Sequence, residues 1–215
     1  MDKLKNKVKK KILNLVDLMP YGRDFYLIMT KNRRSINYRG VFESFGKAQV
    51  GVPVTTANNY DIVNAIKAVN NEQEKRHLDN WFHDTDYPLL YWLSKNFTAQ
   101  STVLELGGSV GHFFYSIQNF CTVPEKLKWI IAELPEAVKL GREIAKERME
   151  NRLSFLDSNE IALTDPADIF LTAGTLQYMS ENLSDILKTL KAQPKHVLVH
   201  NLPVHSKKAF WTHQN

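Results

Sequence analysis

A glycine-rich turn between an apolar run and an aromatic run constrains this 215-residue chain more than any other feature. Residues 103–106 suit a buried strand, glycines follow at 107, 108 and 111, and residues 112–118 can begin a helix. Glycine lets the backbone take positive φ angles and lets a ligand approach without meeting a Cβ. The helix start beyond the turn offers N–H groups to a carboxylate or phosphate. The pattern predicts the first half of a nucleotide-binding βαβ unit.

The spacing of the turn residues limits which class of ligand the turn can bind. The dinucleotide fingerprint G-x-G-x-x-G requires glycine where this chain has Ser109 and His112, and the Gly-Lys-Ser/Thr of a P-loop is absent. What remains is Glu105-x-Gly107-x-x-x-Gly111, an acid on the strand just before a glycine turn. A turn that only joins a strand to a helix is the alternative interpretation.

Strand and helix patterns alternate along the body of the chain. Strands are predicted at 127–132, 153–157, 168–173 and 196–200, and helices at 59–82, 88–96 and 135–150, with a further helix capped by Ser180. This alternation predicts an α/β fold, a Rossmann-like doubly wound parallel sheet with right-handed crossovers. Ligands of such sheets lie at the carboxyl ends of the strands.

Acidic residues fall at those predicted strand ends. Glu133 lies 22 residues beyond Gly111, a distance that suits an acid accepting hydrogen bonds from both ribose hydroxyls, although a surface glutamate is the alternative. Asp157 either accepts from an adenine amino group or caps the segment after its strand. The complete predicted set is Glu105, Gly107, Gly108, Ser109, Gly111, Glu133, Leu134, Asp157, Thr172, Ala173 and Gly174.

Charge divides the chain unevenly. Residues 1–40 carry 11 Lys/Arg against 3 Asp/Glu, whereas the remainder carries 17 against 20, so the body is not basic and a nucleic-acid partner is not favoured. Residues 3–19 can form an amphipathic helix whose lysines, from Lys3 to Lys11, suggest contact with an anionic membrane; we favour a solvated or docked helix instead. We expect a basic, irregular extension over 1–58 and a ligand-binding domain over 59–215.

Cysteine content and hydropathy bear on the compartment. The single cysteine, Cys121, excludes an internal disulfide and fits a reducing environment. Uninterrupted apolar runs stay short of the roughly 18 residues that a membrane span needs. We therefore expect a cytoplasmic protein, at most peripheral to the inner membrane surface.

The turn resembles motif I of the class I S-adenosylmethionine (SAM)-dependent methyltransferases. The acid-Leu-Pro at residues 133–135 is similar to the plant-type small-molecule O-methyltransferases. Gly40-Val-Phe-Glu-Ser-Phe45 and Gly174-Thr-Leu-Gln-Tyr178 resemble more closely a family of methyltransferases from bacterial surface-polysaccharide (O-antigen) biosynthesis clusters. The resemblance implies SAM as cofactor and methyl transfer to a hydroxyl or amine of a small molecule or saccharide intermediate.

Two departures from that resemblance matter. Gln177 stands where the plant-type enzymes carry a basic histidine, so a base, if the reaction needs one, must come from elsewhere. The candidates are His112, His200 and His205, and the spacing of the last two is not that of a zinc site. The usual fold also closes with a sixth and a seventh strand. Only ten residues follow His205, so we expect truncated C-terminal strands and a sheet edge that a partner, including a second copy, is free to complete.

Two other functions stay open at this point. The chain fits a non-catalytic methyltransferase-like module that acts through protein contacts, as the missing strands and Gln177 suggest. It also fits, less well, a nucleic-acid methyltransferase that uses the basic leader, although an Asn/Asp-Pro-Pro-aromatic sequence is absent. An oxidoreductase is a distant third, because the dinucleotide fingerprint is broken.

Overall fold

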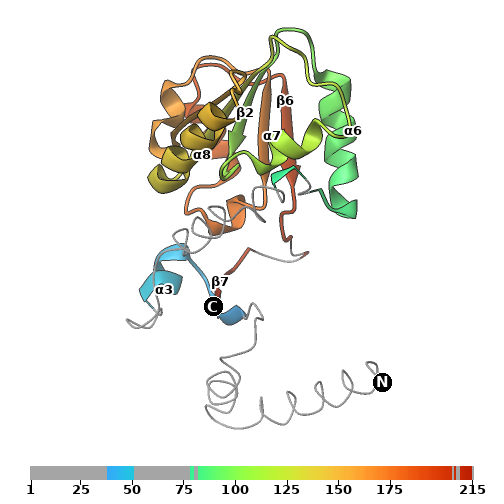
Figure 1. Ribbon diagram of the computed structural model, residues 1–215. Helices are drawn as coiled ribbons and strands as arrows, with labels where there is room; N and C mark the ends of the chain where they lie inside the picture. Colours follow the sequence, from blue (N-terminus) through green and yellow to red (C-terminus); the bar gives the residue numbers. More distant parts are fainter. Residues whose placement is uncertain (1–37, 51–77, 80–81, 205, 207–208, 215) are drawn as a thin grey trace, which may run out of the picture. The chain divides into compact units, whose positions relative to one another are not determined.

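The computed structural model describes residues 38–50, 78–79, 82–204, 206 and 209–214 (Figure 1). The chain forms two compact units, one of residues 1–52 with 210–215 and one of residues 53–209. The predicted leader helix over 3–19 and His205 lie outside the described residues, as does nearly all of the predicted helix over 59–82.

A five-stranded sheet forms the centre of the larger unit. Its strand order is β4-β3-β2-β5-β6, and every neighbouring pair is parallel. The chain moves outward from β2 to β4 and then returns to the other side of β2, which places the topological switch point between β2 and β5. The strands are β2 (Thr102–Leu106), β3 (Lys128–Glu133), β4 (Leu153–Asp157), β5 (Ile169–Ala173) and β6 (His196–His200).

Helices cover both faces of this sheet. Alternate residues of each strand point to opposite faces, and here both faces carry apolar side chains that helices bury. Val103 of β2 belongs to the larger apolar core, which α6 (Tyr87–Asn96), α7 (His112–Ile117) and α8 (Pro135–Glu147) cover (Figure 1). Leu104 belongs to a smaller core on the other face, which α9 (Leu183–Thr189) covers. The predicted α/β class and doubly wound parallel sheet are thereby confirmed.

Local sequence sets where the helices begin. Pro88 and Pro135 lie in the first turns of α6 and α8, where the missing N–H costs no helical hydrogen bond. The predicted cap of α9 was wrong. Asn182, not Ser180, has the extended capping conformation, and its side chain accepts the Asp185 N–H at 3.1 Å. The Ser180 hydroxyl instead donates to the carboxylate of Glu181 at 2.7 Å.

Short 3-10 segments and the smaller unit complete the described chain. The 3-10 turns are η1 (Asp84–Asp86), η2 (Ser158–Leu163) and η3 (Leu176–Tyr178). In the smaller unit, β1 (Tyr38–Phe42) pairs antiparallel with β7 (Trp211–Gln214), and α3 (Phe45–Val50) comes after β1. The expectation of an irregular segment was therefore wrong for residues 38–42 and 45–50, because the pairing partner comes from the far end of the chain.

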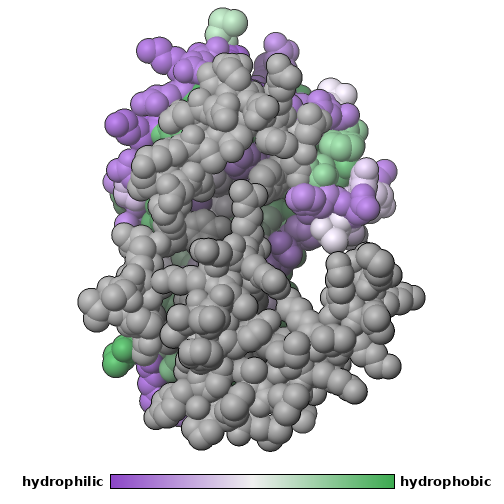
Figure 2. Space-filling model, turned by 60° about the horizontal axis from the view of Figure 1, so that its bottom comes forward, coloured by the Kyte–Doolittle hydropathy of each residue, from purple (hydrophilic) through white to green (hydrophobic). Residues whose placement is uncertain are grey.

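The surface and the sheet edge bear on what the larger unit can contact. Hydrophilic side chains predominate on the described surface visible in Figure 2, with smaller hydrophobic areas between them. None of the described helices is long and apolar enough to cross a membrane. Within the described residues β6 pairs only with β5, so it is an edge strand of the five-stranded sheet.

Candidate functional site

The glycine turn after β2 is held by its own backbone. The N–H of Gly107 donates to the Ala132 carbonyl at the end of β3 at 2.9 Å, and the N–H of Gly111 donates to the Gly108 carbonyl at 3.0 Å. Gly107 and Gly111 have φ angles of +80° and +98°, and Ser109 has +52°. The turn thus needs left-handed conformations that glycine adopts without steric cost.

Two of the turn glycines make room for side chains of this same chain. A Cβ on Gly107 would lie 1.9 Å from Oγ1 of Thr175, and a Cβ on Gly108 would lie 2.6 Å from Cδ of Glu105. The Thr175 hydroxyl also donates to the Gly107 carbonyl at 3.4 Å. These glycines are therefore required by internal packing, whether or not a ligand approaches them.

Glu105 lies beneath the turn and does not face outward. It is 2% exposed, and its carboxyl Oε2 accepts the indole N–H of Trp129 at 2.8 Å. Burial raises its pKa from 4.5 to about 7; the indole hydrogen bond opposes the rise, and the charge of Glu133 adds to it. A direct ligand contact by Glu105 stays a prediction, and its position beneath Gly108 indicates that it supports the turn from below.

Glu133 ends β3 beside the turn. Its Oε1 accepts the Ser109 N–H at 3.3 Å, and its Oε2 accepts the N–H of Leu134 at 2.5 Å. Burial raises its pKa, while these two hydrogen bonds act in the opposite direction. A carboxylate oxygen has two lone pairs, so each oxygen can still accept one further hydrogen bond. This geometry leaves a fixed, two-pronged acceptor at the predicted ribose position.

The backbone amides of the turn divide into engaged and available groups. The N–H groups of Gly107, Ser109 and Gly111 donate to Ala132, Glu133 and Gly108. Among the described residues, the N–H groups of Gly108 and Val110 meet no acceptor. Of the turn amides, these two are therefore the ones available to an anionic ligand group.

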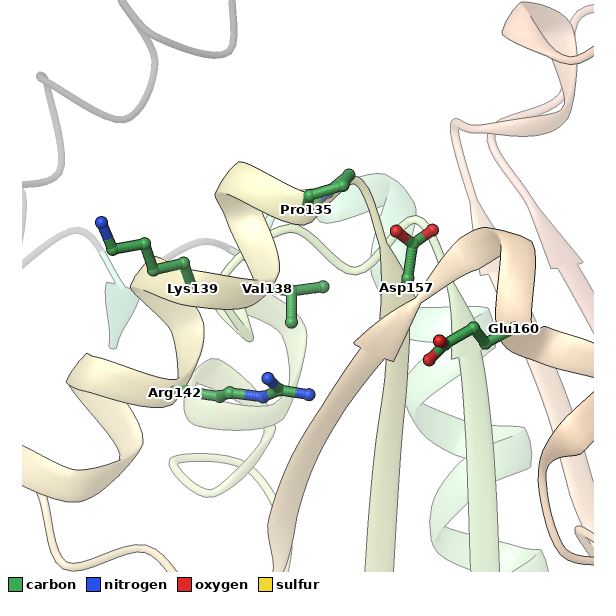
Figure 3. Close-up of a pocket in the computed structure, with 6 residues that line it drawn as sticks. All are labelled: Pro135, Val138, Lys139, Arg142, Asp157 and Glu160. Carbon is green, nitrogen blue, oxygen red and sulfur yellow. The ribbon is translucent and has the colours of Figure 1, made fainter.

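A depression of about 460 Å³ opens between the start of α8 and the segment after β4 (Figure 3), beside Asp157, the residue that is in register with Glu133 of β3. Asp157 lies at its rim and caps η2, with Oδ1 accepting the Asn159 N–H at 2.9 Å. The capping alternative for Asp157 is thus confirmed, while the adenine contact stays a prediction. The depression is lined by Pro135, Val138, Lys139, Arg142, Asp157 and Glu160.

The carboxyl end of β5 lies on the other side of the turn. Thr172 is 1% exposed, and its hydroxyl has no hydrogen-bonding partner among the described residues. Gly174, two residues further along the chain, has a φ angle of +71°. Its carbonyl accepts a hydrogen bond from the side-chain N–H of Gln177 at 2.8 Å. Thr172 is thus enclosed in the sheet next to the turn, and Ala173 and Gly174 lie nearer the surface.

Two of the three candidate histidines, His112 and His200, lie in the described chain, and their surroundings differ. His112 begins α7, and burial lowers its pKa to about 4, so it is neutral near pH 7 and a weak base. His200 ends β6, and its Nε2 lies 2.7 Å from Oδ1 of Asp86. Sequence reasoning missed Asp86, whose one visible signal was its place two residues before Pro88 at a helix start. Clusters of three or more metal-ligating side chains are absent from the described part of the chain.

Comparisons with known proteins give partial structural matches. No protein-family model matches the chain, and no curated protein sequence matches it. Among solved structures, a SAM-dependent methyltransferase from Aquifex aeolicus is 24% identical over 61% of this chain and 67% of its own, with a TM-score of 0.43.

Two further structures extend the comparison. The mitomycin 7-O-methyltransferase MmcR is 17% identical over 69% of this chain and 47% of its own, with a TM-score of 0.39. PKMT2 from Rickettsia typhi, in complex with AdoHcy, is 17% identical over 49% of this chain and 22% of its own, also with a TM-score of 0.39. The chain spans less than half the length of these two proteins.

Proposed function

We propose that this protein binds SAM at the carboxyl edge of the β2–β3–β4 strands and transfers its methyl group to a hydroxyl or amine of a small-molecule or saccharide acceptor. The observation that carries the proposal is Glu133, a carboxylate fixed across the glycine turn by the Ser109 N–H at 3.3 Å. It lies at the carboxyl end of β3, the neighbour of β2, and open α/β sheets bind their ligands outside the carboxyl ends of their strands.

The residues at this edge of the sheet match three parts of SAM: the ribose, the adenine base and the methionine carboxylate. The two free acceptor positions of Glu133 match the two hydroxyls of a ribose. The adjoining depression offers Pro135 and Val138 as apolar surface for a base, with the Asp157 carboxylate at its rim. The amides of Gly108 and Val110 are available to the carboxylate of the methionine part.

The protein's contribution would be position and desolvation. SAM supplies an activated methyl on a sulfonium, so the demanding chemistry belongs to the cofactor. The chain's own residues would hold the adenosine on the β3–β4 side and hold the acceptor nucleophile in line with the methyl. A homo-oligomer, a cytoplasmic location and a role in polysaccharide biosynthesis belong to this proposal as sequence-based predictions; for the leader, a solvated or docked helix is favoured over a peripheral membrane contact.

Calorimetric titration with SAM tests the cofactor assignment. Glu133→Gln keeps the size of the side chain but replaces one acceptor oxygen with an NH₂ donor, so we expect SAM affinity to fall about 10- to 100-fold. Glu136→Gln is the matched control, because Glu136 is exposed in the first turn of α8 and should leave affinity unchanged. A folded wild type that does not bind SAM, or equal affinity in both variants, would refute the assignment.

One observation favours a second function, a methyltransferase-like module without turnover. The Thr175 side chain lies against Gly107, where the predicted methionine part would approach. Tight SAM binding with no methylation of any sugar or small-molecule acceptor, tested with methyl-labelled SAM, would favour this module. Labelled product would favour the enzyme.

A further inference from the structure

We propose that His200, held by Asp86, is the base that takes the proton from a hydroxyl acceptor; this deepens the proposed methyl transfer and rests on it. The two residues are 114 positions apart in the chain and meet at the carboxyl edge of the sheet. Asp86 ends η1 and precedes α6, and His200 ends β6. Only the tertiary structure brings Asp86 and His200 together.

The carboxylate of Asp86 is fixed at both oxygens. Oδ1 lies 2.7 Å from Nε2 of His200, and Oδ2 accepts the backbone N–H of His83 at 2.8 Å. Asp86 is 8% exposed, so competition from water for these contacts is weak. A carboxylate with both oxygens engaged cannot rotate away, and it holds the imidazole ring in one orientation.

This contact selects the tautomer of His200. A carboxylate accepts hydrogen bonds, so the proton of a neutral imidazole lies on Nε2 and the lone pair lies on Nδ1. In the described part of the chain, Nδ1 has no hydrogen-bonding partner, and 19% of the side chain is exposed. The ring therefore presents an unoccupied basic nitrogen near the surface of the sheet edge.

The position of His200 suits the acceptor side of the site. His200 is in register with Ala173 of β5, and its carbonyl accepts the Gly174 N–H at 3.0 Å. Neighbouring strands lie about 5 Å apart, so β6 is about 10 Å from β2 and the turn. Because the β3–β4 side carries the groups proposed for adenosine, the β5–β6 side is left for the acceptor.

The proposed transfer balances in atoms and electrons. The acceptor oxygen forms a bond to the methyl carbon, the sulfonium–carbon bond breaks, and its electron pair stays on sulfur. The hydroxyl proton moves to Nδ1 of His200, whose imidazolium still donates through Nε2 to Asp86. The ion pair that forms stabilises the protonated base, and the proton then leaves to water. His200 is the catalytic residue, and Asp86 is a positioning residue.

Long-range ¹H–¹⁵N spectra of the histidine rings test the pair without any acceptor. We expect His200 as the Nε2–H tautomer, with the chemical shift of an unprotonated nitrogen at Nδ1. His196 is the internal control, because it lies on the same strand, is exposed and has no carboxylate hydrogen bond among the described residues. Its tautomers should be mixed.

Substitution of Asp86 sharpens the test. In Asp86→Asn the single side-chain oxygen cannot serve both the His83 N–H and His200, so the Nδ1–H tautomer should become populated. Reaction of His200 with diethyl pyrocarbonate should then slow several-fold, while Asp84→Asn, an exposed neighbour in η1, should change neither result.

The outcomes separate this inference from the proposed function. An Nδ1–H tautomer in the wild type, or an unchanged tautomer in Asp86→Asn, overturns the role of the pair even where calorimetry shows SAM binding. A wild type that fails to bind SAM refutes the donor assignment, whatever the histidine spectra show. SAM binding together with the expected tautomers supports both.

Discussion

Two buried carboxyl groups lie at the same edge of the sheet, and each is bonded to the N–H of an aromatic ring. Glu105 accepts from the Trp129 indole at 2.8 Å, and Asp86 contacts the His200 imidazole at 2.7 Å. The indole has one nitrogen and only donates, whereas the imidazole has a second nitrogen that can accept a proton. The first pair can therefore only build the core, and the second can also perform chemistry.

The largest effect should follow from breaking the core pair. Trp129→Phe removes the indole donor and part of a fully buried ring, and it leaves the Glu105 carboxyl without a partner. We expect the free energy of unfolding to fall by about 3–4 kcal/mol in chemical denaturation. Trp92→Phe is the control, because Trp92 is 55% exposed and should cost less than about 0.5 kcal/mol. Equal losses in the two variants would contradict the structural role of the pair.

The pH dependence of stability should come from Glu105. Its pKa is about 7 in the fold against 4.5 for the free group, so between these pH values the folded state binds more protons than the unfolded state. Stability from this group is complete below pH 4.5 and is lost as the pH rises through 7, about 3 kcal/mol in total.

The substitution Glu105→Gln should remove this dependence while keeping an oxygen for the indole. Denaturation at pH 5 and pH 8 should show that the wild type loses stability and that the variant loses much less. An identical decrease in both proteins would show that the titrating group lies elsewhere.

A smaller effect should come from the glycine that encloses Glu105. A Cβ on Gly108 would lie 2.6 Å from Cδ of Glu105, so Gly108→Ala should cost about 1–3 kcal/mol through overpacking. In the Glu105→Ala background the clash is absent, and the added cost of Gly108→Ala should shrink to less than half. Additive losses in the double variant would argue that the turn, not the contact, is responsible.

The smallest change in stability should come from the second pair. His200→Gln leaves an amide near Asp86 at a partly exposed position, so we expect the free energy of unfolding to change by less than about 1 kcal/mol. The same variant should retain SAM affinity by calorimetry, since His200 lies on the acceptor side. A loss comparable to that of Trp129→Phe would erase the contrast between the two pairs.

Local patterns carried most of the architecture. The apolar runs that became β4 and β6 were predicted with the bounds that the structure shows, and the alternation of strands and helices defined the parallel sheet. The spacing of apolar residues indicates which segments form buried strands, and this spacing can be read from a single sequence. The glycine positions also followed from sequence, because positive φ angles restrict the choice of residue.

The contacts between distant segments were decided by tertiary structure. The pairing of β1 with β7 joins residues from opposite ends of the chain. Thr175 meets Gly107, and Asp86 meets His200, across 68 and 114 positions. Neither contact produces a periodic pattern in the sequence. Each depends on which strand ends become neighbours in the strand order of the sheet. The amino-acid sequence therefore determined which kinds of strand, turn and acid are present. Only the folded sheet decided which acid is buried under a glycine and which one holds a histidine.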